Sequence, residues 1–431
     1  MAAPAQLPWD LFQEHLEEAT FLWQQWEAAL SAANYTLGEV AAGPEARLLA
    51  HLDALVLGGR PVAEKLLLPA LADEPEPARV AAWAMLAAED ADHFDEALAA
   101  LAGAEPPQAR ALARAFALSS HPAISPRFTA LWVHAEPRLR ALILSVMETR
   151  DIPWASAQLP QTLTSPEPEL LLPSLRLLRR APTRDPAALA YLEYALSAPE
   201  PAVRAEAMGT GVAVGSRTVW DACRREVLLP EAGRLPMALL ALSPQPADRV
   251  TLHERLRDPA TTRSALWALG FAADLEAADA ALALCADEAL GPLAGEVFST
   301  ITGLVLDGPF RAAGKTVGPD VEEVTADDAP PEVQPEDDLP APNPKALEDW
   351  WRQQRGRWKP GQRAIGGQPR TAETVRAALI DGGMWRRPVL AIELAMLTRA
   401  PVLVDLQAWS RDQLRALAAA PAPAVMAGGR R

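Results

Sequence analysis

The sequence is poor in cysteine and contains no long apolar run. Its two cysteines, Cys223 and Cys285, form neither a CxxC pair nor a disulfide framework, so we expect a reducing, cytoplasmic compartment. No run of 18 apolar residues occurs, which argues against a transmembrane helix, and we expect no membrane partner. The first residues lack the basic and apolar regions of a secretory signal, so none is expected.

Residues that favour β-strands are also scarce. Aromatic residues make up 6% of the chain, and valine and isoleucine seldom cluster. Half of the residues are hydrophobic, but many of these are alanine, which has the highest helix propensity and lets helices pack closely. The composition therefore predicts an all-α fold.

Negative charge predominates over most of the chain. The formal net charge is −16, and the 344 residues before Lys345 carry −24, because 15 lysines and arginines stand against 7 acids from Lys345 onward. A protein that binds mainly nucleic acid needs a clustered basic surface, so we do not expect nucleic acid as the main partner. The acidic body favours a protein partner with a basic surface.

Prolines recur along the central part of the chain at intervals of 29 to 33 residues. They are Pro77, Pro107, Pro137, Pro168, Pro201, Pro230, Pro259 and Pro292. Most follow an acidic residue and precede a stretch rich in alanine and leucine, as expected where proline occupies the first turn of a helix. A period near thirty is typical of stacked helical repeats. It predicts an α-solenoid, a superhelix of about eight helix-turn-helix units.

Composition divides the chain into four expected segments. Residues 1–58 contain two helical stretches that would form an N-terminal cap, since a repeat array must cover its first open face. Residues 59–306 hold the repeats. Residues 307–345 form an acidic, proline-rich linker that we expect to be disordered. Residues 346–431 form a small basic helical module, rich in tryptophan and arginine, with a frayed tail.

The second helices of several units resemble HEAT repeats, in which an Asp-Pro turn precedes a helix of the form V-R-x-x-A-x-x-A-L-G. The best matches are Val203, Arg204 and Ala207 in one unit and Arg263, Ala265 and Ala268-Leu269-Gly270 in another. The units at Pro168 and Pro230 match poorly, and Pro173 and Pro236 are expected to interrupt their helices.

The segments that flank the repeats resemble an uncharacterised bacterial family of HEAT-like repeat proteins. The resemblance lies in HLEEATFLW from His15, ARLLAHLDALVLGG from Ala46, WKPGQR from Trp358, GGQP from Gly366 and RRPVLAIELAML from Arg386. The chain departs from the family in its long acidic linker and at Ala364, where an aromatic residue is more usual. Members of the family look like cytoplasmic accessory proteins, often encoded near type VI secretion components. The resemblance therefore implies a setting and no particular reaction.

Two motifs suggest ligand chemistry and are better explained otherwise. The stretch GPFRAAGKT from Gly308 resembles a P-loop, but it has five residues before Gly-Lys-Thr where the phosphate-binding loop has four. Metal-ligand residue types recur at helical spacing in Glu14, His15, Glu18, His51 and Asp53. A hydrogen bond between the two histidines is the favoured alternative, because a full ligand set is missing. We predict no cofactor, no metal and no catalytic residue.

Two further patterns are interpreted structurally. Arginines recur after the prolines at Arg79, Arg110, Arg140, Arg204 and Arg263, and bonds to acids or carbonyl groups of the preceding turn are favoured over a ligand-binding stripe. The glycines Gly209, Gly211 and Gly215 lie in a predicted helix with no strand before it. Close helix packing therefore accounts for them better than a dinucleotide site.

Tryptophans and arginines alternate at the start of the C-terminal module, and we predict that they bind protein. The residues are Trp350, Trp351, Arg352, Arg355, Arg357 and Trp358. Tryptophan and arginine are the residue types most enriched in binding hot spots. The alternatives are that two tryptophans pack in the core of the module while the arginines are solvated or pair with the linker, or that the patch binds nucleic acid.

These features predict a non-catalytic scaffold or adaptor for protein–protein interactions, accessory to type VI secretion. The second helices would line one concave binding face. One alternative is an immunity protein that masks a toxin, and another is a HEAT-like repeat enzyme with a hidden cofactor site. The sequence contains no GxSxG, HExxH or kinase-loop signature, so we expect no enzyme activity.

Overall fold

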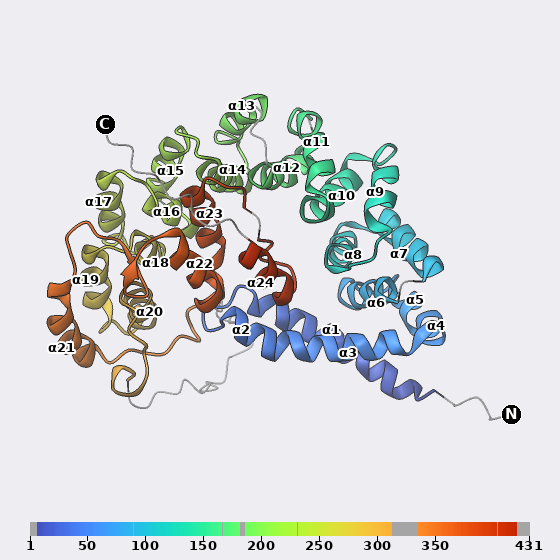
Figure 1. Cartoon of the computed structure of the whole chain (residues 1–431), viewed down its shortest axis with the longest axis horizontal. Helices are drawn as coiled ribbons and strands as arrows, with labels where there is room; N and C mark the ends of the chain where they lie inside the picture. The colour runs from blue at the N-terminus through green and yellow to red at the C-terminus, as the bar shows by residue number, and fades with distance from the viewer. Residues whose placement is uncertain are drawn as a thin grey trace, which may run out of the picture. The chain divides into compact units, whose positions relative to one another are not determined.

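The computed structural model describes residues 7–88, 90–165, 167–181, 186–230, 232–312, 335–402 and 404–419. Nearly all regular structure in these residues is helical (Figure 1), which confirms the predicted all-α fold. The named strands are the short β1 (Ala364–Ile365) and β2 (Gln368–Pro369), which pair antiparallel. None of the described helices has the length and apolar character needed to cross a lipid bilayer.

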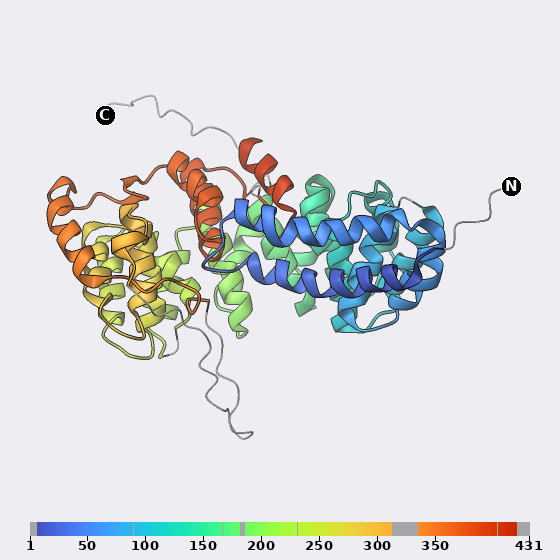
Figure 2. The same cartoon turned by 90° about the horizontal axis from the view of Figure 1, so that it is seen from below.

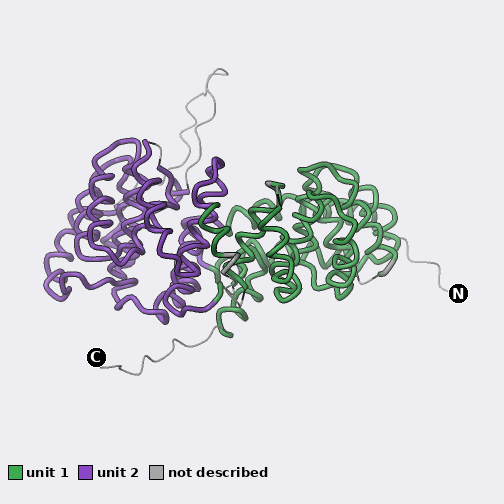
Figure 3. The backbone as a smooth tube through the Cα atoms, turned by 90° about the horizontal axis from the view of Figure 1, so that it is seen from above, with its two compact units in different colours: residues 1–30, 37–194, 401–420 green, residues 31–36, 195–400, 421–431 purple. Residues whose placement is uncertain are grey.

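Contacts within the chain divide it into two compact units, neither of which is continuous in sequence (Figure 3). Unit 1 comprises Met1–Leu30, Leu37–Tyr194 and Pro401–Ala420. Unit 2 comprises Ser31–Thr36, Ala195–Ala400 and Pro421–Arg431. These boundaries differ from those of the four predicted segments, because the cap and the C-terminal module each contribute to both units.

Unit 1 is built on a layer of successive helices. Its elements are α1 (Trp9–Ala29), α2 (Leu37–Val40), the π-helix η1 (Ala41–Glu45), α3 (Ala46–Leu57), α4 (Gly59–Val62), the π-helix η2 (Ala63–Leu67), α5 (Leu68–Ala70), α6 (Pro75–Ala87), α7 (Ala91–Gly103), α8 (Pro106–Leu118), α9 (Ile124–Trp132), α10 (Pro137–Arg150), α11 (Ile152–Leu163), α12 (Pro168–Arg180), most of α13 (Pro186–Ala195) and α24 (Ser410–Ala419). Helices α6, α8, α10 and α12 pack each on the next, and α7, α9 and α11 pack against this layer. Helices α1 and α3 lie side by side (Figure 2), and both pack on α6.

Unit 2 repeats this arrangement and adds a second set of elements. Its elements are α14 (Pro201–Val214), α15 (Val219–Val227), α16 (Arg234–Ala241), α17 (Pro246–Arg255), α18 (Thr262–Ala272), α19 (Leu275–Leu284), α20 (Gly291–Thr302), the 3-10 helix η3 (Gly308–Phe310), α21 (Pro344–Gln354), the 3-10 helix η4 (Arg355–Arg357), β1, β2, α22 (Ala372–Asp381), the 3-10 helix η5 (Met384–Arg386) and α23 (Arg387–Thr398). Helices α14, α16, α18 and α20 stack in succession, with α15, α17 and α19 packed against them. Helix α23 packs on α14 and α16, so part of the surface that the sequence left open to a partner is covered by the chain itself.

The recurring prolines mark helix starts. Six of them lie in the first turn of a helix, whereas Pro230 and Pro259 lie in the turns before α16 and α18. The expectation that Pro173 and Pro236 interrupt their helices is wrong. Helix α12 continues through Pro173, and α16 begins only at Arg234, so that Pro236 falls in the first turn, where its missing N–H costs no hydrogen bond.

Most of the predicted linker, residues 313–334, lies outside the described residues, as does the predicted frayed tail beyond residue 419. The described end of the linker packs on unit 2. Glu336 is only 3% exposed and lies 2.6 Å from Arg234 and 3.1 Å from Arg263. An acidic residue that the sequence assigned to a solvated linker is therefore an internal ion-pair partner.

The segment 401–419 is anchored in unit 1 by tryptophan. Trp409 stacks on Trp26, with ring centroids 4.5 Å apart, and meets Trp23 and Trp83 edge-on. Its indole N–H donates to the Leu118 carbonyl oxygen at 3.1 Å. Because Trp409 is 1% exposed and its one polar group is hydrogen-bonded, its burial leaves no polar atom unsatisfied.

Next to Trp409, a buried carboxylate ties the same segment to the start of the chain. Glu45 is 4% exposed and accepts hydrogen bonds from the Ser410 hydroxyl at 2.7 Å and the Ser410 N–H at 3.0 Å. It also accepts one from the Trp26 indole at 3.0 Å. The donors compensate for the desolvation of this carboxylate.

A candidate binding cavity in unit 2

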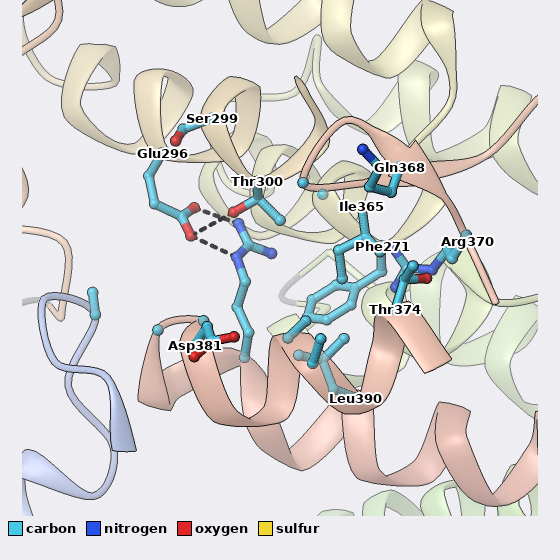
Figure 4. A pocket seen from close by; sticks show the side chains of 18 residues that line it. Phe271, Glu296, Ser299, Thr300, Ile365, Gln368, Arg370, Thr374, Asp381 and Leu390 are labelled. Atoms are coloured by element: carbon cyan, nitrogen blue, oxygen red, sulfur yellow. Dashed lines mark hydrogen bonds and ion pairs between the residues drawn. The ribbon is translucent and has the colours of Figure 1, made fainter. Parts of the chain in front are cut away.

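Unit 2 contains a cavity of about 450 Å³ whose walls come from five parts of the chain (Figure 4). The end of α18, the second half of α20, the β1–β2 hairpin, α22 and the start of α23 all contribute lining residues. Ala33, from the short segment of unit 2 between α1 and α2, completes the lining. A cavity of this size is typical of sites that bury a small ligand or a few residues of a partner.

The β1–β2 hairpin is held against the end of α20 by backbone hydrogen bonds. The N–H groups of Gly366 and Gly367 donate to the carbonyl oxygens of Thr300 and Ile301 at 2.8 and 3.0 Å. These carbonyl groups lie in the last turn of a helix, where helical partners are lacking. A Cβ at Gly367 would lie 2.5 Å from the Thr302 oxygen, and its φ is +72°, so the approach requires glycine.

Arg386 forms one wall and is almost fully buried, at 3% exposure. Its guanidinium group pairs with Glu296 through two contacts, of which Nε to Oε1 is 2.6 Å. Nη1 donates to the Trp267 carbonyl oxygen at 3.3 Å. The group reaches this position because α18 has a glycine here: a Cβ at Gly270 would lie 2.6 Å from Nη1. The glycine of the HEAT-like signature thus makes room for an arginine from η5.

A second buried ion pair lies at the other end of the cavity. Arg370 and Glu393 have side chains 2% and 1% exposed, and Nε of Arg370 donates to Glu393 at 2.6 Å. Arg363 lies 3.8 Å from the same carboxylate and donates to the carbonyl oxygens of Phe271 and Ala272 at the end of α18. Burial, and next the neighbouring Arg370, lower the pKa of Arg363 to about 10.

The polar groups of the cavity lie at two separate ends. Figure 4 shows Gln368, Arg370 and Thr374 on one side and Glu296 and Asp381 on the other. The apolar side chains between them are Phe271, Ile365 and Leu390. Gln368 at one end and Asp381 at the other are both exposed, so the cavity opens to solvent along the edge between these two residues. Its chemistry suits a ligand with an apolar body and polar groups at both ends.

Two of the residues predicted to bind protein make internal contacts. Trp351 is 3% exposed, packs edge-on against Phe298, and donates its indole N–H to Asp279 at 2.7 Å. Arg355 pairs with the same carboxylate, with Nη2 also at 2.7 Å. Trp351 therefore packs against α20 in the core of unit 2.

The other four predicted binding residues lie nearer the surface. Trp350 stacks on Trp351 and is half-buried, and Trp358 meets Trp351 edge-on and is also half-buried. Arg352 is exposed and pairs with Asp349 at 2.8 Å. Arg357 is exposed. None of the six lines the cavity, and their binding role remains a prediction.

The motifs that the sequence analysis interpreted structurally are mostly explained. The Nδ1 atoms of His15 and His51 lie 3.1 Å apart, as the hydrogen-bond alternative expected. A Cβ at Gly211 would lie 2.8 Å from Val219, so α14 and α15 pack closely there. The described residues contain no group of three or more potential ligands arranged around a metal site. The P-loop-like stretch lies partly outside the described residues.

Two of the five repeated arginines, Arg140 and Arg204, donate to carbonyl oxygens of the preceding turn as expected, whereas Arg79 and Arg263 bind groups elsewhere. Arg140 donates to Trp132 and Val133, Arg204 to Ala198, Pro199 and Glu226, and Arg263 to Ala289 and Glu336. Arg79 pairs with Glu27 of α1 at 2.6 Å. Arg110 is exposed. Four of the five arginines are therefore engaged in contacts within the chain.

The charged residues of the cavity were missed by sequence reasoning. Arg363, Arg386 and Glu393 fall in segments that were recognised only by resemblance, Arg370 directly follows such a segment, and Glu296 falls in an ordinary repeat helix. A usable signal was present in Glu393, an acid in the middle of the apolar run VLAIELAML. A lone acid on a buried face requires a cation nearby.

Comparison of the chain with family models, with curated proteins and with solved structures finds no match.

Proposed function

We propose that this protein is a HEAT-like repeat scaffold that binds another protein and catalyses no reaction itself. The packing within each unit supports the repeat interpretation, since alternate helices stack in one layer and the intervening helices pack against it. Proteins built in this way contact partners over extended surfaces formed by several units.

The observation that carries the proposal is the construction of the unit 2 cavity. Its two buried carboxylates are already paired, Glu296 with Arg386 and Glu393 with Arg370, so its walls are held in place before a partner binds. A pre-formed site loses little conformational entropy on binding. Charges occupied in this way favour recognition by shape and hydrogen bonding over proton transfer.

The proposed setting is that of a cytoplasmic adaptor beside the type VI secretion machinery. The flanking segments that carry the family resemblance include WKPGQR and RRPVLAIELAML, and both contribute to the walls of the cavity or to the ion pairs behind it. The net charge of −16 favours a secretion effector or machinery component with a basic surface.

The test is affinity purification from the native host with the cavity blocked. Ala377 lines the cavity at its exposed edge on α22, so Ala377→Trp should fill the entrance. The matched control is Ala99→Trp, at an exposed position of α7 in unit 1. We expect the wild type and the control to retain the same partner at moderate salt, and the cavity variant to lose it.

Two results would contradict the proposal. Either no specific protein is retained by the wild type, or the same protein is retained equally by the cavity variant. Circular dichroism and thermal unfolding of each variant show whether a loss of binding reflects the cavity or the fold.

A further inference from the structure

Arg370 has a donor with no acceptor at one end of the unit 2 cavity. Two of its guanidinium nitrogens donate to Glu393, but Nη1 is buried and has no hydrogen-bond partner among the described residues. An unsatisfied buried donor is destabilising, more so when it carries charge. The Arg370 side chain is 2% exposed and lies on the wall of the cavity, so the unsatisfied donor points to an acceptor supplied by a bound molecule.

The charge around Arg370 calls for an anion. Arg363 and Arg370 share one carboxylate, that of Glu393, so this end of the cavity holds one more positive charge than negative. The lowered pKa of Arg363 has the same origin in part, because Arg370 disfavours a second charge beside it. A bound carboxylate would relieve this repulsion and accept from Nη1 at once.

The opposite end of the cavity favours a cation. Asp381 is exposed on the last turn of α22 and forms no ion pair with the residues that the structure describes. Glu296 lies on the same side, but Arg386 and the Thr300 hydroxyl already donate to its oxygens. Asp381 is therefore the acid left for a ligand.

The space between the ends is apolar. Phe271 and Leu390 are 1% and 2% exposed, and Ile365 is 7% exposed, so their side chains belong to the core of unit 2 and present only a small apolar surface to the cavity. An aliphatic group placed here would be removed from water on all sides except the open edge at Gln368 and Asp381.

We propose that this cavity captures the C-terminal residue of a partner polypeptide, with its terminal carboxylate on Arg370, its apolar side chain against Phe271 and a preceding basic residue at Asp381. The inference rests on the proposed function and names the part of the partner that is bound. The open edge gives the rest of the polypeptide a way out, which a fully enclosed cavity would not. The acidic charge of the whole chain agrees with a basic residue close to the bound end.

Calorimetry on the purified full chain tests this with synthetic peptides. The probes are acetyl-Gly-Ser-Lys-Ala-X with a free carboxylate, where X is Ala, Val, Leu or Phe, together with the same four peptides carrying a C-terminal amide. We expect at least one peptide with a free carboxylate to bind. Its C-terminal amide should bind more weakly by about tenfold or more, because the charge-assisted hydrogen bond is lost. Ala377→Trp should abolish binding.

A surface variant tests the other end. Asp381→Asn removes the negative charge without touching either buried ion pair, and should weaken the lysine-containing peptide several-fold. Replacing the peptide lysine by alanine should weaken binding to the wild type to a similar extent, and should make no difference to the Asp381→Asn protein.

Three results would overturn the inference. Equal binding of acid and amide would exclude carboxylate recognition. Free leucine binding as tightly as the best peptide would assign the cavity to a small amphipathic metabolite. No binding of any peptide at about 1 mM would exclude a terminal-residue site of useful affinity. In the last case, retention of a partner by the wild type and its loss from Ala377→Trp would leave the proposed function intact.

Discussion

Each unit is completed by a segment from the last part of the sequence, and the two segments are held by different interactions. In unit 1 the segment 401–419 inserts Trp409 among three other tryptophans, and the ring is 1% exposed. In unit 2 the residues from Arg363 to Glu393 are held by two buried ion pairs, and a cavity of about 450 Å³ remains beside them. The later segment is thus held mainly by aromatic packing in unit 1 and by paired charges in unit 2.

The difference has an energetic side. Burial of a large aromatic ring stabilises a fold without any need for exact pairing. A buried ion pair gains little net stability, because desolvation offsets the attraction, but loss of one partner is severe. Unit 1 is therefore expected to depend on volume, and unit 2 on the completeness of its charge pairs.

The largest effect is expected from Trp409→Ala. The change leaves a cavity among Trp23, Trp26 and Trp83 and should cost about 3–5 kcal/mol of unfolding free energy. Denaturant unfolding measures this, and limited trypsin digestion should show new cleavage at Arg411 and Arg415. Trp358→Ala, at a half-buried ring in unit 2, is the control and should cost clearly less. Equal losses would remove the distinction that we draw for unit 1.

Glu393→Gln should have the next largest effect. It leaves Arg370 and Arg363 without their shared carboxylate and should cost about 3 kcal/mol. The double variant Arg370→Leu with Glu393→Met should recover most of that loss, since an apolar pair of similar volume needs no desolvation. Denaturant unfolding of both proteins is the measurement.

The control for the Arg370–Glu393 prediction is a substitution in an exposed ion pair. Asp349→Asn breaks pairs with Lys345 and Arg352 at the surface and should leave unfolding unchanged. A double variant no more stable than Glu393→Gln alone would show that the charges themselves, and not their pairing, hold unit 2 together.

The smallest effect concerns a carboxylate of unit 1 that lacks full pairing. Glu148 is 7% exposed, and one of its oxygens has no hydrogen-bond partner among the described residues. Burial raises its pKa to about 7, against the opposing influence of three nearby arginines. The folded state thus holds this proton more tightly than the unfolded state, so the stability that it contributes is complete below about pH 4.5 and is lost as pH rises through 7.

Glu148→Gln removes that dependence. The variant should gain about 1–3 kcal/mol relative to the wild type on going from pH 5.5 to pH 8, as urea unfolding at both pH values would show. Glu169→Gln, on the exposed side of α12, should show no such change. A pH-independent difference between Glu148→Gln and the wild type would mean that Glu148 is ionised throughout.

The helices were predictable because local signals specify them. Alanine content, the spacing of Pro137, Pro168 and Pro201, and the acid before each of these prolines all act within one or two turns. The role of Gly211 in close packing followed from the same reasoning. Only its partner, Val219, needed the structure.

The cavity was not predictable by these means. Gly270 matches a repeat signature, yet the space that a side chain would need at this position is taken by the guanidinium group of Arg386. Arg386 lies 116 residues further along the chain. Glu336 reads as a linker residue until Arg234 and Arg263 are placed beside it. Such pairings depend on which distant segments return to which helices, and no periodicity within one segment records that choice.

The division of the chain into discontinuous units bears on how it is made. Ser410 bonds to Glu45, 365 residues earlier, and Met384 donates to Tyr35. During synthesis the first helices emerge long before the residues that complete their surroundings, so the apolar side chains at these places stay uncovered until Met384 and Ser410 have been added. Closure over such separations is slow. We therefore expect this chain to depend more on chaperones during folding than a simple stack of repeats does, even where the final stabilities are equal.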